Sequence, residues 1–195
     1  MSDALGQKDS YTQAHARRVA AYAERLAQRM GLPNDQVRQI ALGGMLHDVG
    51  KLALSDRIFS SKQTALSEDL LDEVHSHPLI GAALLRNISC DNAIVEVVLY
   101  HHERLDGSGY PFGLGADEIP FNALLVSVAD CFDAITTDRP YQRRKSRAHA
   151  FSIMNQMAGP ALPRDMVALM IEEVRTHGME SNMSAPPPLP RAANG

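Results

Sequence analysis

Several histidine and aspartate side chains fall on the apolar faces of segments that have helical periodicity. His15 lies four residues before Val19 on one such face, and His47 lies seven residues after Ile40 on a second. Asp130 lies in the middle of the most apolar segment of the chain. The histidines and aspartates that this pattern directs inward are His15, His47, Asp48, His101, His102 and Asp130.

Imidazoles and carboxylates that converge in one core are typical of a metal site. A buried carboxylate without a partner is costly, and a cation or a metal normally compensates it. A single buried histidine is more often a hydrogen-bonded core residue, but this set is too large for that interpretation. Nitrogen and oxygen ligands of these types suit iron, manganese or zinc. Two ions need about this many ligands and a bridging solvent molecule, so we expect a two-metal centre.

Other residues that could do chemistry lack this pattern. His75, His149 and His177 have no inward-facing partners at helical spacing, so we expect them at the surface. Cys90 and Cys131 lie far apart and show no C-x-x-C spacing, which predicts free buried thiols.

The elements that must position the candidate ligands are helices, and we expect an all-α fold. Gly31, Leu32 and Pro33 end the first helix, Pro78 opens another, and a glycine-rich loop covers residues 106–117. Residues 52–66 are expected to be irregular. The predicted helices span about 12–30, 34–47, 68–74, 78–88, 91–103, 121–137, 147–157 and 164–175.

Length and composition favour one domain that binds a small ligand. We expect a single domain over residues 1–179 and a disordered proline-rich tail over 180–195. The net charge of −4 argues against nucleic-acid binding. The chain has neither a signal-peptide pattern nor an apolar run long enough to span a membrane, which favours the cytoplasm. Local positive charge for a small anion is available in Arg139, Arg143, Arg144, Lys145 and Arg147.

Four motifs resemble the HD-GYP family, in its order and with its spacings, over about residues 9–142. They are HDVGK at 47–51, HP at 77–78, HHERLDGSGYP at 101–111, and VADCFDA at 128–134 followed by RPY at 139–141. The resemblance implies a helical HD-type fold whose metal centre hydrolyses cyclic di-GMP to linear pGpG or on to GMP. Sensor or receiver domains often accompany this domain, so signalling partners are expected, and the chain is either a stand-alone enzyme or an excised domain.

The resemblance also implies a ligand set, with Asp48 bridging two ions. His15 matches a histidine that the family has upstream of the four motifs. In some family members a glutamate four residues before that histidine supports a third metal, but this chain has Tyr11 at that position. We therefore expect two ions, iron or manganese. The implied ligands are His15, His47, Asp48, His77, His101, His102 and Asp130.

Catalytic and substrate-binding roles follow from the same resemblance. A solvent molecule that bridges two divalent cations loses a proton near neutral pH and attacks phosphorus, so Asp48 is catalytic through the metals. Lys51 is expected to contact the scissile phosphate or to protonate the departing sugar oxygen. Tyr110 is expected to pack against guanine or to bond a phosphate. The substrate contacts implied are Lys51, Asp106, Gly109, Tyr110, Pro111 and Arg139.

Three alternatives stay open at the level of sequence. The first is an HD phosphohydrolase that acts on another cyclic dinucleotide or on a nucleotide. The second is a catalytically silent module that binds cyclic di-GMP or a partner protein. The third is a metal-stabilised helical scaffold, although structural sites are usually closed by four ligands and this chain offers seven.

Overall fold

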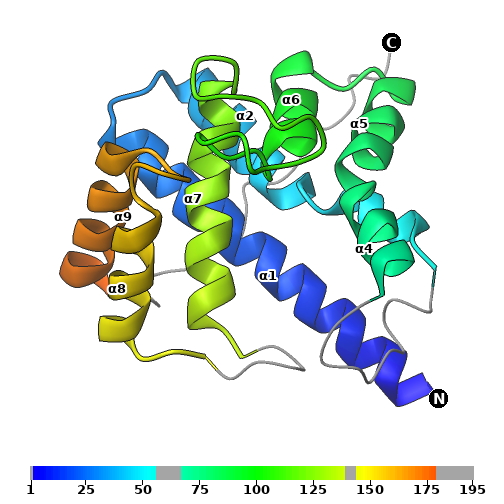
Figure 1. Cartoon of the computed structure of the whole chain (residues 1–195), viewed down its shortest axis with the longest axis horizontal. Helices are drawn as coiled ribbons and strands as arrows, with labels where there is room; N and C mark the ends of the chain where they lie inside the picture. Colours follow the sequence, from blue (N-terminus) through cyan, green and yellow to red (C-terminus); the bar gives the residue numbers. More distant parts are fainter. Residues whose placement is uncertain (1, 56–66, 139–143, 179–195) are drawn as a thin grey trace, which may run out of the picture.

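Two long helices, α1 (Ser2–Arg29) and α7 (Phe121–Thr136), cross at the centre of the fold (Figure 1). In this computed structural model the described residues are 2–55, 67–138 and 144–178, with side chains described from Thr12 onward. The apolar stripe of α1 packs on α7, where the rings of Tyr22 and Phe132 meet edge to face at 5.3 Å. Helix α7 is buried on most sides, as its apolar sequence predicts.

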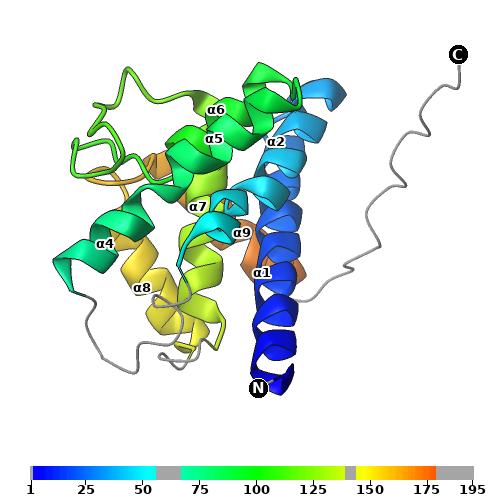
Figure 2. The same cartoon turned by 90° about the vertical axis from the view of Figure 1, so that its right-hand side faces the viewer.

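The other helices lie on two sides of α7. Helices α8 and α9 cover one side, and α4, α5 and α6 lie on the other (Figures 1 and 2). The described residues form no strand, only two isolated bridges, so the predicted all-α class is confirmed. The remaining elements are α2 (Asn34–Leu46), the 3-10 helix η1 (Val49–Ala53), α4 (Glu68–His75), α5 (His77–Asn87), α6 (Asn92–Tyr100), α8 (Arg147–Met157) and α9 (Arg164–His177).

Two helix boundaries differ from the prediction. Helix α1 begins at Ser2 and not near residue 12, because no proline interrupts the earlier segment and extending a formed helix costs little. Helix α6 ends at Tyr100 and not near Glu103, where the chain tightens and the Glu103 amide donates to the Tyr100 carbonyl. In a continuing helix the side chains of His101 and His102 would point about 100° apart. Because α6 ends before them, both side chains can face the same space.

Close backbone approaches at two glycines hold the central elements together. A Cβ on Gly44 would lie 3.1 Å from Ala20 Cα, so α1 and α2 pack backbone to backbone at this point. A Cβ on Gly50 would lie 1.9 Å from the carbonyl oxygen of His77 and 2.7 Å from the amide nitrogen of Gly81. Only glycine permits η1 to pack on the first turn of α5 in this way.

Other expectations concern the thiols, the cap of α6 and the ends of the chain. Cys90 and Cys131 are free thiols, half-buried and buried respectively. Asp91 caps α6, since its carboxylate accepts from the Ala93 amide at 2.9 Å. None of the described helices combines the length and apolarity needed to cross a membrane. The predicted disordered tail and most of the predicted irregular segment lie outside the described residues.

Candidate metal centre

The first group of candidate ligands joins α1, α2 and α7. His15 projects from the middle of α1, and its Nε2 lies 3.3 Å from Asp130 Oδ1 on α7 and 3.8 Å from Asp48 Oδ2. His47, at the end of α2, places its Nε2 3.4 Å from the same Asp48 oxygen. One donor atom each from His15, His47 and Asp48 lies within 4.8 Å of the others, which is close enough to hold one ion.

The second group joins the start of α5 to the turn after α6. His77 Nε2 lies 3.3 Å from Asp48 Oδ1 and 3.4 Å from His101 Nε2. The His102 ring lies 4.0 Å from the His101 ring, measured between centroids. Asp48, His77, His101 and His102 also each offer a donor atom within 4.8 Å of the rest.

Asp48 belongs to both groups. Its Oδ2 faces His15 and His47, whereas its Oδ1 faces His77 and His101. A carboxylate in this position has the geometry of a bridge between two neighbouring cations.

Backbone carbonyls fix the orientation of three of the imidazoles. The Nδ1 of His47 donates to the Gly44 carbonyl at 2.7 Å, that of His77 to Val74 at 2.6 Å, and that of His101 to Val98 at 2.9 Å. Because a carbonyl oxygen only accepts, each Nδ1 carries a hydrogen, and Nε2 is the nitrogen of each ring that faces the cluster and that could bind a metal once it is deprotonated.

The donor set fits a divalent cation. His47 Nε2 and Asp48 Oδ1 are buried and make no hydrogen bond within the described part of the chain, whereas buried polar atoms normally have partners. Burial and nearby imidazoles lower the pKa values of His101 and His102, which keeps both rings in the neutral form that binds metal. The residues present therefore suit a metal ion that would satisfy the orphaned atoms.

Strong coupling between His47 and Asp48 marks the centre of the cluster. Burial alone would lower the pKa of His47, but the carboxylates of Asp48 and Asp130 outweigh it and raise that pKa to about 9. Burial alone would raise the pKa of Asp48, but the charges of His47 and Lys51 hold it well below its usual range. A raised pKa favours the doubly protonated ring of His47 near neutral pH, so a metal ion would have to displace the hydrogen on Nε2.

Lys51, predicted to be catalytic, lies beside the carboxylate of Asp48. Its Nζ is 2.7 Å from Asp48 Oδ2, and the side chain is one third exposed. The ammonium group therefore reaches both the cluster and solvent.

Tyr110, predicted to contact substrate, stacks on two imidazoles. Its ring lies 4.6 Å from His102 and 4.1 Å from His75, with interplanar angles below 30° in both pairs. Its pKa is raised chiefly by burial, which keeps the phenol protonated. His75 is exposed, as predicted, but the prediction missed its contact with Tyr110 because the two residues meet only in the folded chain.

Hydrogen bonds and a close backbone approach to Glu103 hold the glycine-rich loop. The buried carboxylate of Glu103 accepts from the Phe112 amide at 2.8 Å and from the Leu114 amide at 2.9 Å. Gly109 approaches so closely that a Cβ there would lie 2.4 Å from Glu103 Cα. Glu103 was not predicted; its position directly after the paired histidines was the available signal.

The remaining predicted substrate contacts differ in position. The exposed Asp106 accepts from the amide and the hydroxyl of Ser108, so its carboxylate stabilises its own turn. Pro111 follows a cis peptide bond after Tyr110 and is half-buried. Arg139 lies outside the described residues.

Asp133 is a second carboxylate that the sequence analysis did not predict, and it contacts the nitrogen of His15 that points away from Asp48 and Asp130. His15 Nδ1 lies 2.7 Å from Asp133 Oδ2. Asp133 is three residues after Asp130, so both share one face of α7, and that spacing was the signal in the sequence.

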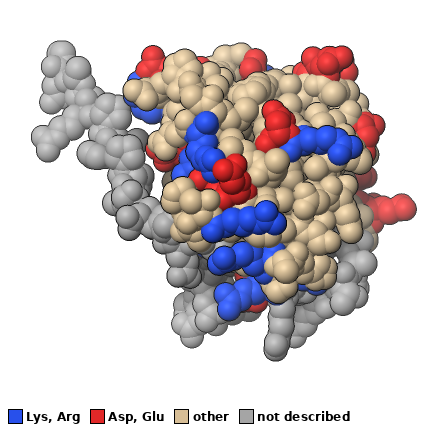
Figure 3. Space-filling model, turned by 90° about the vertical axis from the view of Figure 1, so that its left-hand side faces the viewer, with Lys and Arg blue, Asp and Glu red and all other residues tan. Residues whose placement is uncertain are grey.

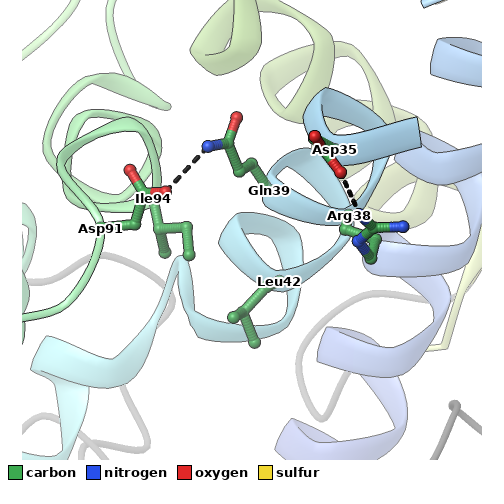
Figure 4. A pocket seen from close by; sticks show the side chains of 6 residues that line it. All are labelled: Asp35, Arg38, Gln39, Leu42, Asp91 and Ile94. Atoms are coloured by element: carbon green, nitrogen blue, oxygen red, sulfur yellow. Dashed lines mark hydrogen bonds and ion pairs between the residues drawn. The ribbon is translucent and has the colours of Figure 1, made fainter. Parts of the chain in front are cut away.

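A shallow surface pocket is lined by none of the candidate metal ligands. The pocket, of about 400 Å³, is lined by the start of α2 and the start of α6, and its polar side chains pair with one another: Gln39 with Asp91, and Arg38 with Asp35 (Figure 4). On the face in Figure 3, basic and acidic side chains are interspersed. His149 and His177 are exposed, as predicted.

Comparisons with known proteins agree with this geometry. A protein-family model described as HD domain matches residues 1–162. Cyclic di-GMP phosphodiesterase PA4108 of Pseudomonas aeruginosa is 40% identical over 156 residues, covering 80% of this chain and 37% of that protein. A cyclic di-GMP phosphodiesterase of Thermotoga maritima is 35% identical over 170 residues, covering 85% and 45%. The chain therefore spans less than half the length of these two curated relatives.

A solved structure has the same fold. Bd1817 of Bdellovibrio bacteriovorus, described as an HDG"Y"P protein, superposes with a TM-score of 0.69 at 22% sequence identity. The superposition covers 84% of this chain and 52% of that one.

Proposed function

The chain belongs to the HD domain family and to its HD-GYP branch, and from this membership we propose that it is a metal-dependent phosphodiesterase that hydrolyses cyclic di-GMP. The two curated relatives carry that activity in their names, and this chain has the HD, HP, HH and GYP motifs in order. The products are linear pGpG or GMP.

The observation that carries the proposal is the position of Asp48 between two groups of imidazoles. We propose that His15, His47 and Asp130 hold one ion with Asp48, and that His77, His101 and His102 hold the second. Iron or manganese suits this mixture of imidazole and carboxylate. Two bound ions would supply an activated water and would neutralise charge on the phosphate.

The protein's own side chains contribute positioning and charge. Asp48 fixes the spacing between the two groups, since one oxygen serves each of them. We propose that Lys51, whose Nζ lies 2.7 Å from Asp48 Oδ2, contacts the scissile phosphate or donates a proton to the departing sugar oxygen. Tyr110 supports the His102 ring, and its hydroxyl is the part that remains for a substrate. Asp106, Gly109 and Pro111 shape the loop around it, and Arg139 is proposed to bind phosphate.

The test is hydrolysis of cyclic di-GMP by protein reconstituted anaerobically with iron(II) or with manganese. Metal content is measured on the same samples of wild type, Asp48→Ala and Asp35→Ala. Asp35 lies at the exposed start of α2 and serves as a matched control. We expect turnover and about two ions per chain, the number that a two-metal centre requires, in wild type and Asp35→Ala, and neither in Asp48→Ala.

Other outcomes would redirect the assignment. Full metal binding with cyclic di-GMP bound but intact would favour a silent signalling module. No binding of cyclic di-GMP, with hydrolysis of another cyclic dinucleotide, would keep the enzyme class and change the substrate.

A further inference from the structure

Asp133, which is outside the proposed ligand set, has hydrogen-bond partners at both carboxylate oxygens, and one of these partners is His15. Asp133 is completely buried on α7, and its Oδ2 lies 2.7 Å from His15 Nδ1. Arg18, one turn after His15 on α1, donates from Nε to Asp133 Oδ1 at 2.6 Å and from Nη2 to Oδ2 at 3.1 Å. The Thr137 hydroxyl donates to Oδ1 at 3.2 Å.

These contacts define which nitrogen of His15 carries the hydrogen. Arg18 only donates, and it reaches both oxygens of Asp133, so the two side chains form a bidentate ion pair. The oxygens of a carboxylate held in this way only accept, and therefore His15 Nδ1 donates. The lone pair of Nε2 then faces Asp48 and Asp130.

His15 differs in this respect from the other imidazoles with an anchored Nδ1. His47, His77 and His101 donate to neutral carbonyls three residues earlier in the chain. His15 donates to a charged group on another helix, 118 residues later. A carboxylate partner raises the basicity of an imidazole more than a neutral partner does, and it strengthens its bond to a metal.

We propose that Asp133, held by Arg18, is a positioning residue that fixes the tautomer of His15 and strengthens the ion bound by His15, His47, Asp48 and Asp130. This inference deepens the proposed function, because it rests on His15 being a metal ligand. Asp133 itself touches neither ion nor substrate. Its effect is confined to the first group of ligands, since His77, His101 and His102 have separate supports.

The test is a manganese titration of metal-free protein, followed by electron paramagnetic resonance, without substrate. We expect two binding events in wild type. In Asp133→Ala the affinity of one event falls by roughly 10- to 100-fold, the usual effect of losing such a support, while the other is unchanged. Asp133→Asn, which keeps the shape but not the charge, shows a smaller loss in the same event.

Glu173→Gln is the matched control. Glu173 is also a buried carboxylate that ties arginines of α1 to another helix, since Arg25 and Arg29 lie 3.9 and 3.4 Å from it, but it does not contact His15. Both manganese events remain as in wild type in this variant. An equal loss in Glu173→Gln would reduce the role of Asp133 to general stability and would overturn the proposal.

A second readout uses the metal-free protein alone. Nitrogen-15 spectra of the histidine rings should show His15 with its hydrogen on Nδ1 in wild type and as a mixture of tautomers in Asp133→Ala. Unchanged spectra together with unchanged affinity in the Asp133 variants would also contradict the proposal. Neither readout depends on hydrolysis. A wild-type protein that binds manganese but leaves cyclic di-GMP intact would therefore refute the proposed activity, and it would leave the proposed role of Asp133 unaffected.

Discussion

Single side chains in the cluster divide into those that would hold metal and those that hold the ligands in place. In the part of the chain that the structure describes, Asp48 is the one residue that belongs to both groups of candidate ligands, whereas Asp133 and Tyr110 contact those ligands from outside. This division predicts different results for substitutions that lie within a few ångströms of one another.

Replacement of Lys51 by glutamine separates catalysis from metal binding. Loss of the ammonium group should lower kcat by roughly 100-fold or more, the usual contribution of a positioned proton donor, while metal content stays at the wild-type level. The comparison is kcat and metal content in Lys51→Gln and in Arg86→Gln, which also removes a positive charge but at an exposed position of α5. A parallel loss of metal in Lys51→Gln would mean that Lys51 acts by supporting Asp48.

Two substitutions test the roles of the Tyr110 ring and of its hydroxyl separately. Tyr110→Phe keeps the stacking on His102 and should bind metal as wild type does. Tyr110→Ala removes a stacking contact worth about 0.5–1.5 kcal/mol, so the affinity of the second group should fall by roughly 2- to 10-fold. Manganese titration checks this, with Phe112→Ala as the control, because Phe112 is a mostly exposed ring of the same loop. Equal affinities in Tyr110→Ala and wild type would contradict the supporting role.

Helix ends, more than helix middles, present the proposed ligands. His47 and His101 directly follow the last residues of α2 and α6, and His77 begins α5. Of the proposed ligands, only His15 and Asp130 project from helix interiors. At an end, the chain leaves the helical path, and sequence neighbours such as Asp48 can face the same space. The distances between ligands therefore depend on how the helix ends pack together.

Gly50 is the tightest of these packing points. In Gly50→Ala the new Cβ would lie 1.9 Å from the His77 carbonyl oxygen, which is backbone and cannot move alone. We expect a loss of about 3 kcal/mol in the free energy of unfolding, at the upper end of overpacking costs, together with weakened metal binding. Thermal unfolding and metal content test this against Gly115→Ala, where the nearest atom is the flexible end of Glu118 at 3.6 Å. Wild-type stability in Gly50→Ala would show that η1 can move away from α5 without cost.

Sequence patterns could predict the helices and the inward faces of α1, α2 and α7, because an apolar stripe fixes which side chains are buried. They could not predict His77 as an inward residue, since a residue that begins a helix has no preceding stripe; that assignment needed the family resemblance. The contacts of Asp133 with His15 and of His75 with Tyr110 join distant segments, and no local periodicity encodes them.

At the scale of the whole molecule, the proposed ligands connect five helices. A ligand that binds only the native state stabilises it by about 2.7 kcal/mol at a concentration of 100 times its Kd. For a chain of this length we expect manganese at that concentration to raise Tm by roughly 5–10 °C, and EDTA to reverse the shift. Thermal unfolding of wild type and Asp48→Ala tests this, and an equal rise in both would place the bound ion elsewhere.

The sequence separation of 118 positions from His15 to Asp133 has a consequence during synthesis. Ribosomes add about 5–20 residues per second, so α1 waits on the order of ten seconds after it emerges before its partners on α7 follow. During that interval His15, Arg18 and His47 have no carboxylate from α7 to meet, and the first group of ligands is incomplete. If that group binds an ion, insertion would therefore come late in the life of the nascent chain, after the two crossing helices have met.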